Sequence, residues 1–111
     1  MAHPARSACV EACNACAAAC DLCASSCLQE ADANALVRCI ALDMDCAAIC
    51  RLAAAYVARG SAFAEAVCQL CPSVCLTCAE ECGKHSHEHC QQCEQACRRC
   101  ADACRQMLAA H

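Results

Sequence analysis

Nineteen of the 111 residues are cysteines, and their spacing constrains the fold more than any other feature. Most of them follow one another at steps of three or four residues, which keeps side chains on one face of a helix. These steps also match the a and d heptad positions, which face the middle of a bundle. We therefore expect all of the cysteines to point inward, where Leu and Ile would normally lie: Cys9, Cys13, Cys16, Cys20, Cys23, Cys27, Cys39, Cys46, Cys50, Cys68, Cys71, Cys75, Cys78, Cys82, Cys90, Cys93, Cys97, Cys100 and Cys104.

Four segments carry this helical pattern, at about residues 4–28, 35–58, 62–81 and, after a cap at Ser86, up to about 108. No strand-like alternation interrupts them. Four helices of similar length with short links predict an all-α fold, an up-down-up-down four-helix bundle, as a single domain covering residues 1–111.

The breaks between these segments contain capping residues. Asp32 or Asn34 is expected to cap the second helix, and Ser61 the third. Gly60 and Gly83 fit helix C-termini. Pro72 lies inside the third segment, and because the cysteine pattern continues on both sides of it, a kink is expected there and not a break.

Charge and hydropathy exclude several classes of partner. Eight Lys and Arg against 12 Asp and Glu give a net charge of −4, which is unsuited to nucleic acid. The N-terminus has no apolar export segment, and Cys, Asp and Arg interrupt every stretch that might cross a membrane. We therefore expect a cytoplasmic protein without membrane or nucleic-acid partners, in a compartment where thiols stay reduced.

Packing alone does not explain the cysteines. Replacing one buried Cys by Leu would stabilise a bundle by about 1 kcal/mol or more, so the sequence gives up this stabilisation at 19 positions. Disulfides are disfavoured along one helix face, where Cβ atoms lie about 5–6 Å apart although a disulfide needs about 3.8 Å. A thiol oxidoreductase or an iron–sulfur carrier is a further alternative. No nucleophile–base pair can be singled out, so the chain is not expected to be an enzyme.

Metal binding remains, and the ligand type indicates the metal. Soft thiolates select Cu(I), Zn(II) or iron–sulfur clusters. Zn(II) requires four ligands in a tetrahedron, whereas Cu(I) accepts two or three sulfurs and can repeat along a continuous stripe. One monovalent ion per thiolate also neutralises a buried core, which four thiolates around Zn(II) do not. The pattern predicts many Cu(I) ions per chain, with one per cysteine as the ceiling; a metallothionein-like buffer for zinc and copper is the alternative.

Non-cysteine ligands are candidates at a few positions. Asp43 stands at the inward position between Cys39 and Cys46; the favoured interpretation places it at a solvated rim, and the alternative gives it a hydrogen-bonding or metal-binding role near the core. Met44 and His111 are possible auxiliary ligands, and Met107 is favoured as a core filler.

Three histidines, His85, His87 and His89, lie in the link between the third and fourth helices, and in an up-down bundle this link shares one end with the first link. Imidazole binds copper, so we expect copper to enter there, although ordinary exposed loop histidines are the alternative. Four apolar residues are expected to plug the opposite end: Leu52, Val57, Phe63 and Leu108. Apolar residues off the cysteine stripe of the second helix predict an oligomer interface: Leu36, Val37, Ile40, Leu42, Ile49, Leu52 and Tyr56.

Together, these residues resemble the bacterial copper storage proteins without an export signal. The resemblance rests on the stripe from Cys9 to Cys27, on residues 39–43 with Cys46 and Cys50, and on the run 81–90. It implies a homotetramer of four-helix bundles that stores Cu(I) in the cytoplasm, with loading assisted by His and Met at one end. It does not indicate which protein donates or receives the copper. Pro72 departs from the pattern.

Overall fold

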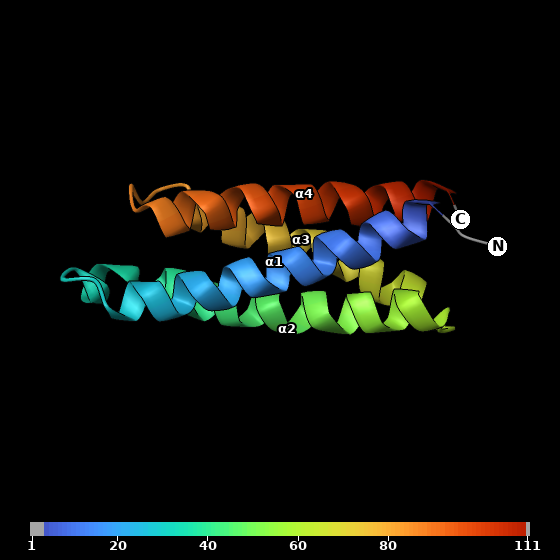
Figure 1. The fold of residues 1–111 in the computed structure, drawn as a ribbon, viewed down its shortest axis with the longest axis horizontal. Helices are drawn as coiled ribbons and strands as arrows, with labels where there is room; N and C mark the ends of the chain where they lie inside the picture. The colour runs from blue at the N-terminus through green and yellow to red at the C-terminus, as the bar shows by residue number, and fades with distance from the viewer. Residues whose placement is uncertain (1–3, 111) are drawn as a thin grey trace.

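The computed structural model describes residues 4–110, which form four long antiparallel helices. These are α1 (Pro4–Leu28), α2 (Val37–Arg59), α3 (Ala64–Cys82) and α4 (Glu88–Ala110), and a short 3-10 helix, η1 (Ala33–Leu36), leads into α2. The fold is the predicted all-α bundle, and no strand occurs between residues 4 and 110. Figure 1 shows the α1–α2 and α3–α4 links at one end, and the α2–α3 turn at the other end with both termini.

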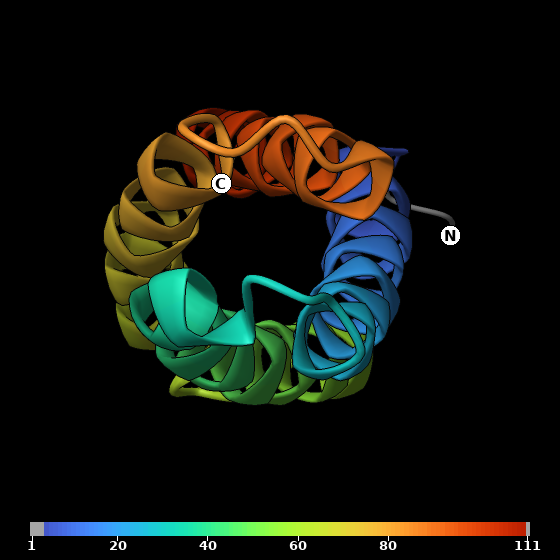
Figure 2. The same cartoon turned by 90° about the vertical axis from the view of Figure 1, so that its left-hand side faces the viewer.

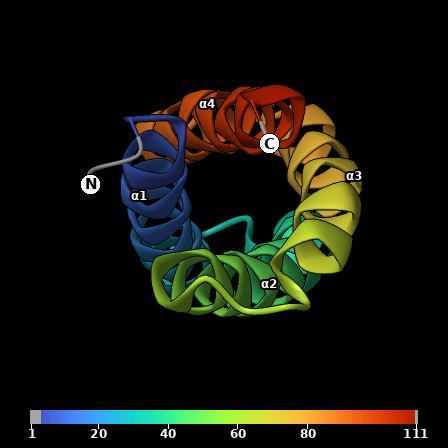
Figure 3. The ribbon, with the colours of Figure 1, turned by 90° about the vertical axis from the view of Figure 1, so that its right-hand side faces the viewer.

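The helices form a ring around one long axis. Each helix packs against the next one in sequence, and α4 packs back against α1. Figures 2 and 3 show this closed arrangement from its two ends. The bundle measures 49 × 19 × 18 Å, so its core is a narrow column that every helix lines over almost its whole length.

Helix starts differ from the sequence expectations. The second helix begins as η1 at Ala33, and neither Asp32 nor Asn34 caps it through a side chain: Leu36 is the N-cap of α2, and no side-chain cap bond is formed there. Ser61 accepts a hydrogen bond from the Phe63 amide at 3.0 Å, yet Phe63 itself is the N-cap of α3. The link at residues 29–36 therefore leaves the Asp32 carboxylate available for another partner.

The α3 helix is continuous at Pro72 and ends at Gly83, as predicted, and the predicted kink at Pro72 stays a prediction. The N–H of Gly83 bonds the carbonyl of Ala79. Its backbone there stays right-handed, so the end of α3 does not require a left-handed glycine.

Gly60 ends α2 by adopting a left-handed conformation, with φ of 65°. Its N–H bonds the carbonyl of Val57 at 3.1 Å, and the N–H of Ser61 bonds that of Tyr56 at 2.9 Å, which is the Schellman pattern. The guanidinium of Arg6 also donates to the Val57 carbonyl at 2.8 Å. A Cβ at Gly60 would lie 3.0 Å from Nη2 of Arg6, so a side chain at this position meets both strain and crowding.

Small side chains fill the core. The buried residues are mainly the cysteines with alanines beside them, together with Leu36, Val57 and Met107. The proposed plug is only partly correct: Val57 is buried and Leu108 packs against the core, but Phe63 and Leu52 are exposed. Met107 takes their place as the buried side chain near this end.

By length and composition α1 is long and apolar enough to cross a membrane. The sequence predicted no such segment. Core helices of soluble proteins pass the same test. All six cysteines of α1 are buried in the bundle, and 33% of its most apolar window is buried.

Replacing Gly60 by Ala should lower the free energy of unfolding of the reduced apo-protein by about 1 kcal/mol, because left-handed backbone is costly for a residue with a Cβ. Urea unfolding followed by circular dichroism measures this change. Gly60→Asn is the matched variant and should lose less, since Asn tolerates this conformation better. Equal stability of the wild type and Gly60→Ala would contradict the assignment of Gly60 as a strained cap.

Candidate metal-binding core

The nineteen cysteine side chains form one continuous column of sulfur. Each of them is 0% exposed, and all are free thiols. Neighbouring sulfurs lie close both along and between helices: Cys9 and Cys13 are 3.9 Å apart on α1, Cys16 and Cys46 3.8 Å apart across α1 and α2, and Cys39 and Cys82 3.3 Å apart across α2 and α3. The prediction that the stripes face inward is confirmed for every cysteine.

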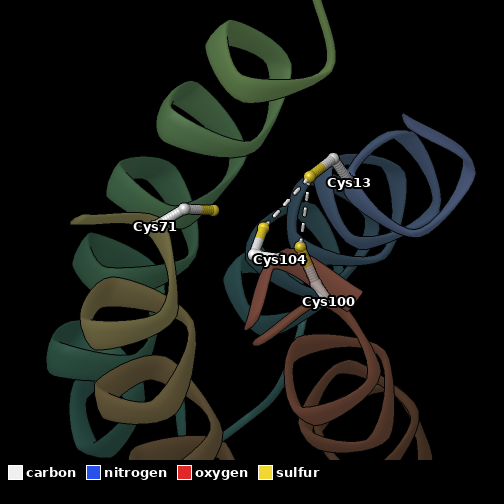
Figure 4. A group of neighbouring side chains, drawn as sticks. All are labelled: Cys13, Cys71, Cys100 and Cys104. Carbon is white, nitrogen blue, oxygen red and sulfur yellow. Dashed lines mark hydrogen bonds between the residues drawn. The ribbon is translucent and has the colours of Figure 1, made fainter. Parts of the chain in front are cut away.

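Several sets of four sulfurs converge along this column. Figure 4 shows one set, in which Cys71 of α3 faces Cys13 of α1 and the pair Cys100 and Cys104 of α4. Within each set all sulfurs lie within 4.8 Å of one another, and sets share members, as Cys16 and Cys46 do. The sets include Cys16, Cys46, Cys50 and Cys75; Cys20, Cys78, Cys93 and Cys97; and Cys23, Cys27, Cys39 and Cys90. Because the sets overlap, metal ions can occupy adjacent sites along the axis without a gap.

Loss of solvent on burial opposes the ionisation of thiols in this column. Loss of solvent, followed by the charge of Cys39, raises the pKa of Cys27 to about 11. Burial likewise raises the pKa of Cys90. A thiolate is stable in this column only next to a cation, so metal binding must displace protons.

Asp43 lies inside the column and not at its rim, which corrects the favoured sequence interpretation. It is 0% exposed. Its Oδ1 accepts hydrogen bonds from Cys78 and Cys93, both at 3.2 Å, and from Cys82 at 3.5 Å. Asp43 follows Cys39 by four residues and precedes Cys46 by three, so the same helical register that buries the cysteines buries the carboxyl. The thiol donors compensate its desolvation.

Burial raises the pKa of Asp43 to about 8. The carboxyl is therefore mostly protonated at neutral pH in the metal-free protein. It places one carboxyl group in a stripe of sulfur.

His89 is the histidine that reaches the sulfur column. Its Nδ1 lies 3.5 Å from Sγ of Cys23, 3.6 Å from that of Cys90 and 3.9 Å from that of Cys27. The side chain is 15% exposed, so it spans the boundary between solvent and the last sulfurs at this end. His89 therefore contacts both the thiols of the column and the polar groups of the links.

The other candidate ligands lie outside the column. His85 contacts Glu81 through Nε2 at 2.9 Å, and His87 stacks on His89 with ring centroids 5.3 Å apart. Met44 points outward and is 61% exposed, so the structure does not bring it to the thiols. His111 lies outside the described residues.

Acidic partners of the histidines were not singled out from the sequence. Glu30 bonds Nε2 of His89 at 2.8 Å, and Asp32 bonds Nε2 of His87 at 3.0 Å. Glu81 is nearly buried beside Arg38, Lys84 and His85, and the hydrogen bond from His85 lowers its pKa. The one sequence signal for Glu30 and Asp32 is their position in the first link, which an up-down bundle places at the same end as the third link with its histidines.

Comparison with known proteins agrees with this geometry. The Cu(I)-bound copper storage protein BsCsp3 shares 45% sequence identity over 94% of this chain and 98% of its own, with a TM-score of 0.89. A cytosolic copper storage protein from Streptomyces lividans, loaded with five coppers, shares 43% identity over 96% of this chain and 93% of its own, with a TM-score of 0.92.

A curated relative in Bacillus subtilis, the uncharacterized cysteine-rich protein YhjQ, is 47% identical over 64 residues. This match covers 58% of the chain and 59% of the relative, so the aligned segment spans less than two thirds of either protein.

The family model for copper storage proteins matches residues 2–109, nearly the whole chain. This match, the shared bundle and the column of buried thiols agree, and the chain belongs to the copper storage protein family.

Proposed function

We propose that this protein stores Cu(I) as cargo on the thiolates of its core, keeps the copper from harming the cell and releases it on demand. The observation that carries the proposal is the sulfur column itself, with all nineteen thiols buried and sulfurs of adjacent helices in contact, as at Cys16–Cys46 and Cys39–Cys82. A zinc site needs one closed tetrahedron. A column of overlapping sets suits an ion that accepts two or three soft ligands and repeats.

Loading exchanges protons for copper. Each Cu(I) that binds a thiol forms an S–Cu bond and releases one proton, so the total charge of the buried column does not change. This neutrality lets a closed, water-poor core fill with ions, which unpaired thiolates do not allow. We expect the bundle to fold before metal binds, because its alanine-rich helices have high helix propensity.

In this proposal copper enters at the end of the bundle where His89 lies. The imidazole lies between solvent and three thiols, Cys23, Cys27 and Cys90, and so offers a first soft-to-borderline ligand on the way inward. Asp43, farther inside, supplies an oxygen ligand or accepts hydrogen bonds from partly loaded thiols. His85, His87 and Met44 have no direct contact with sulfur in this arrangement.

The compartment follows from the thiol chemistry and from a relative. The S. lividans protein is described as cytosolic, and nineteen free thiols require a reducing environment. We place this chain in the cytoplasm as well, acting without catalysis, membrane or nucleic acid.

A homotetramer is also part of the proposal. An apolar groove of about 720 Å³ lies between α2 and α3. Leu42, Ile49, Leu52 and Val74 line it, and Leu52 is 42% exposed. Leu36, expected on this surface, is instead fully buried in the core. Exposed apolar grooves mark association surfaces. In this proposal, copies that associate through the groove leave the end of the bundle at His89 open to solvent.

Anaerobic titration of the reduced apo-protein with Cu(I), against a competing chelator and equimolar Zn(II), tests storage directly. We expect uptake approaching 19 Cu(I) per chain, one per cysteine, with no displacement by Zn(II). Saturation at a few ions, or replacement of Cu(I) by Zn(II), would instead favour a few discrete sites or a mixed zinc and copper buffer.

Asp43 should make the apo-protein less stable as pH rises. The pKa of an aspartate carboxyl is about 3.9 in an unfolded chain, and that of Asp43 is about 8 in the fold, so the folded state holds the extra proton between these pH values. Below about pH 4 the protonated carboxyl contributes its full stabilisation to the folded state. Between about pH 4 and pH 8 the free energy of unfolding falls by up to roughly 1.4 kcal/mol per pH unit. Urea unfolding of the wild type and Asp43→Asn measures the difference, which should shrink as pH falls; parallel pH curves would contradict this.

Leu52→Glu should break the tetramer into smaller species, because it places a charge in the groove between α2 and α3. Light scattering after size exclusion measures the mass. Leu22→Glu is the matched control, on the exposed surface of α1 and outside the groove. Copper capacity should stay unchanged in both variants, and an intact tetramer in Leu52→Glu would exclude this surface.

A further inference from the structure

A second cluster of metal-ligating groups lies just outside the sulfur column, where the two links meet. It contains Glu30 and Asp32 from the α1–α2 link, His87 immediately before α4 and His89 in the first turn of α4. All four side chains remain accessible in part, with exposed fractions of 31%, 55%, 27% and 15% respectively. None of the four contributes sulfur, so the cluster differs in chemistry from the column below it.

Two ring nitrogens converge on one carboxylate oxygen. Oε2 of Glu30 lies 2.8 Å from Nε2 of His89 and 3.2 Å from Nδ1 of His87. Ligand atoms of one tetrahedral Zn(II) ion, each about 2.0–2.1 Å from the metal, lie at similar separations from one another. The two rings are nearly parallel, with an interplanar angle of 4°. Because the rings are stacked, Glu30 must move away and the His87 ring must turn before the in-plane lone pairs of both nitrogens face one cation.

The remaining nitrogen of each histidine already has a partner that fixes the ring. Nε2 of His87 faces Oδ1 of Asp32 at 3.0 Å, and Nδ1 of His89 faces Sγ of Cys23 at 3.5 Å. Histidines that bind metal nearly always donate their other N–H to such an acceptor, often a carboxylate. In the metal-free protein Nε2 of His89 donates to Glu30, so a cation that binds there displaces this proton, and the partners on the far side of each ring leave Nδ1 of His87 and Nε2 of His89 as the ligand atoms.

We propose that Glu30, His87 and His89 form a site for a borderline divalent cation of the Zn(II) class, with Asp32 as the positioning residue for His87. Two imidazoles and one carboxylate with a fourth position open to solvent are a well-known Zn(II) ligand set. The cation's double positive charge balances Glu30 and Asp32. It ties the α1–α2 link to the start of α4, across the end of the bundle that holds His89.

The site is separate from copper storage, but it shares one residue with the proposed entrance. A cation on Nε2 of His89 keeps the proton on Nδ1, which then donates to a thiolate and offers no lone pair to Cu(I). Zn(II) at this site therefore withdraws His89 from the copper path and leaves the sulfurs below unchanged.

X-ray absorption at the zinc edge tests the site on the full chain after one Cu(I) per cysteine has been added, so that thiols do not compete. We expect about one Zn(II) per chain with a nitrogen and oxygen shell at about 2.0–2.1 Å and no sulfur shell at about 2.3 Å. His87→Ala and Glu30→Gln should each lower Zn(II) affinity by about tenfold or more, and Asp32→Asn by about tenfold through loss of orientation. His85→Ala is the matched control and should leave the affinity unchanged.

Absence of bound Zn(II), a shell of sulfur alone, or affinity unaffected by His87→Ala and Glu30→Gln would each overturn the proposal. Copper is counted before zinc is added, so a failure of copper storage appears separately. If copper storage fails, the zinc-edge spectrum still tests the site, because His87→Ala should remove the contribution of nitrogen and oxygen ligands. The replaced side chains are partly exposed, and circular dichroism verifies that each variant keeps its helices.

Discussion

The burial of nineteen thiols in one narrow column is the constraint on which the rest of the structure depends. A cysteine side chain is small and contributes less apolar area than the Leu or Ile it replaces. The helices must therefore approach closely, and alanines beside the cysteines make this possible. The result is a core that holds together through close packing and helix hydrogen bonds, and that still presents sulfur on every side of its axis.

This packing has a chemical consequence. Neutral thiols are tolerated in such a core, whereas isolated thiolates are not. Copper enters as a cation for each proton released, so the filled and the empty column are both close to neutral. Asp43 follows the same logic: burial keeps its carboxyl protonated, and three thiols satisfy its Oδ1. A carboxyl group can therefore remain in the column because it is protonated and because thiols donate hydrogen bonds to it.

The two ends of the bundle differ because the links differ. At the end of the α2–α3 turn, Gly60, Arg6, Val57 and Met107 close the column with backbone caps and apolar packing. At the other end, histidines and carboxylates surround the last sulfurs, and His89 connects the two environments. The proposed entry of copper at the end that holds His89 fits this difference, because the opposite end is closed by apolar packing.

The sequence by itself determined the helices and the inward direction of all nineteen cysteines, because steps of three and four place side chains on one face only. It favoured Cu(I) because thiolates are soft ligands, and it left a zinc and copper buffer as the alternative. Tertiary structure decided what depended on neighbours from other helices. Asp43 was placed correctly by its register but assigned wrongly to the rim, since its thiol donors come from α3 and α4. Met44 and Phe63 turned out to be exposed, and Leu36 to be buried. Glu30 and Asp32 meet His87 and His89 only because two links that are far apart in sequence end side by side, and no local pattern encodes that distance.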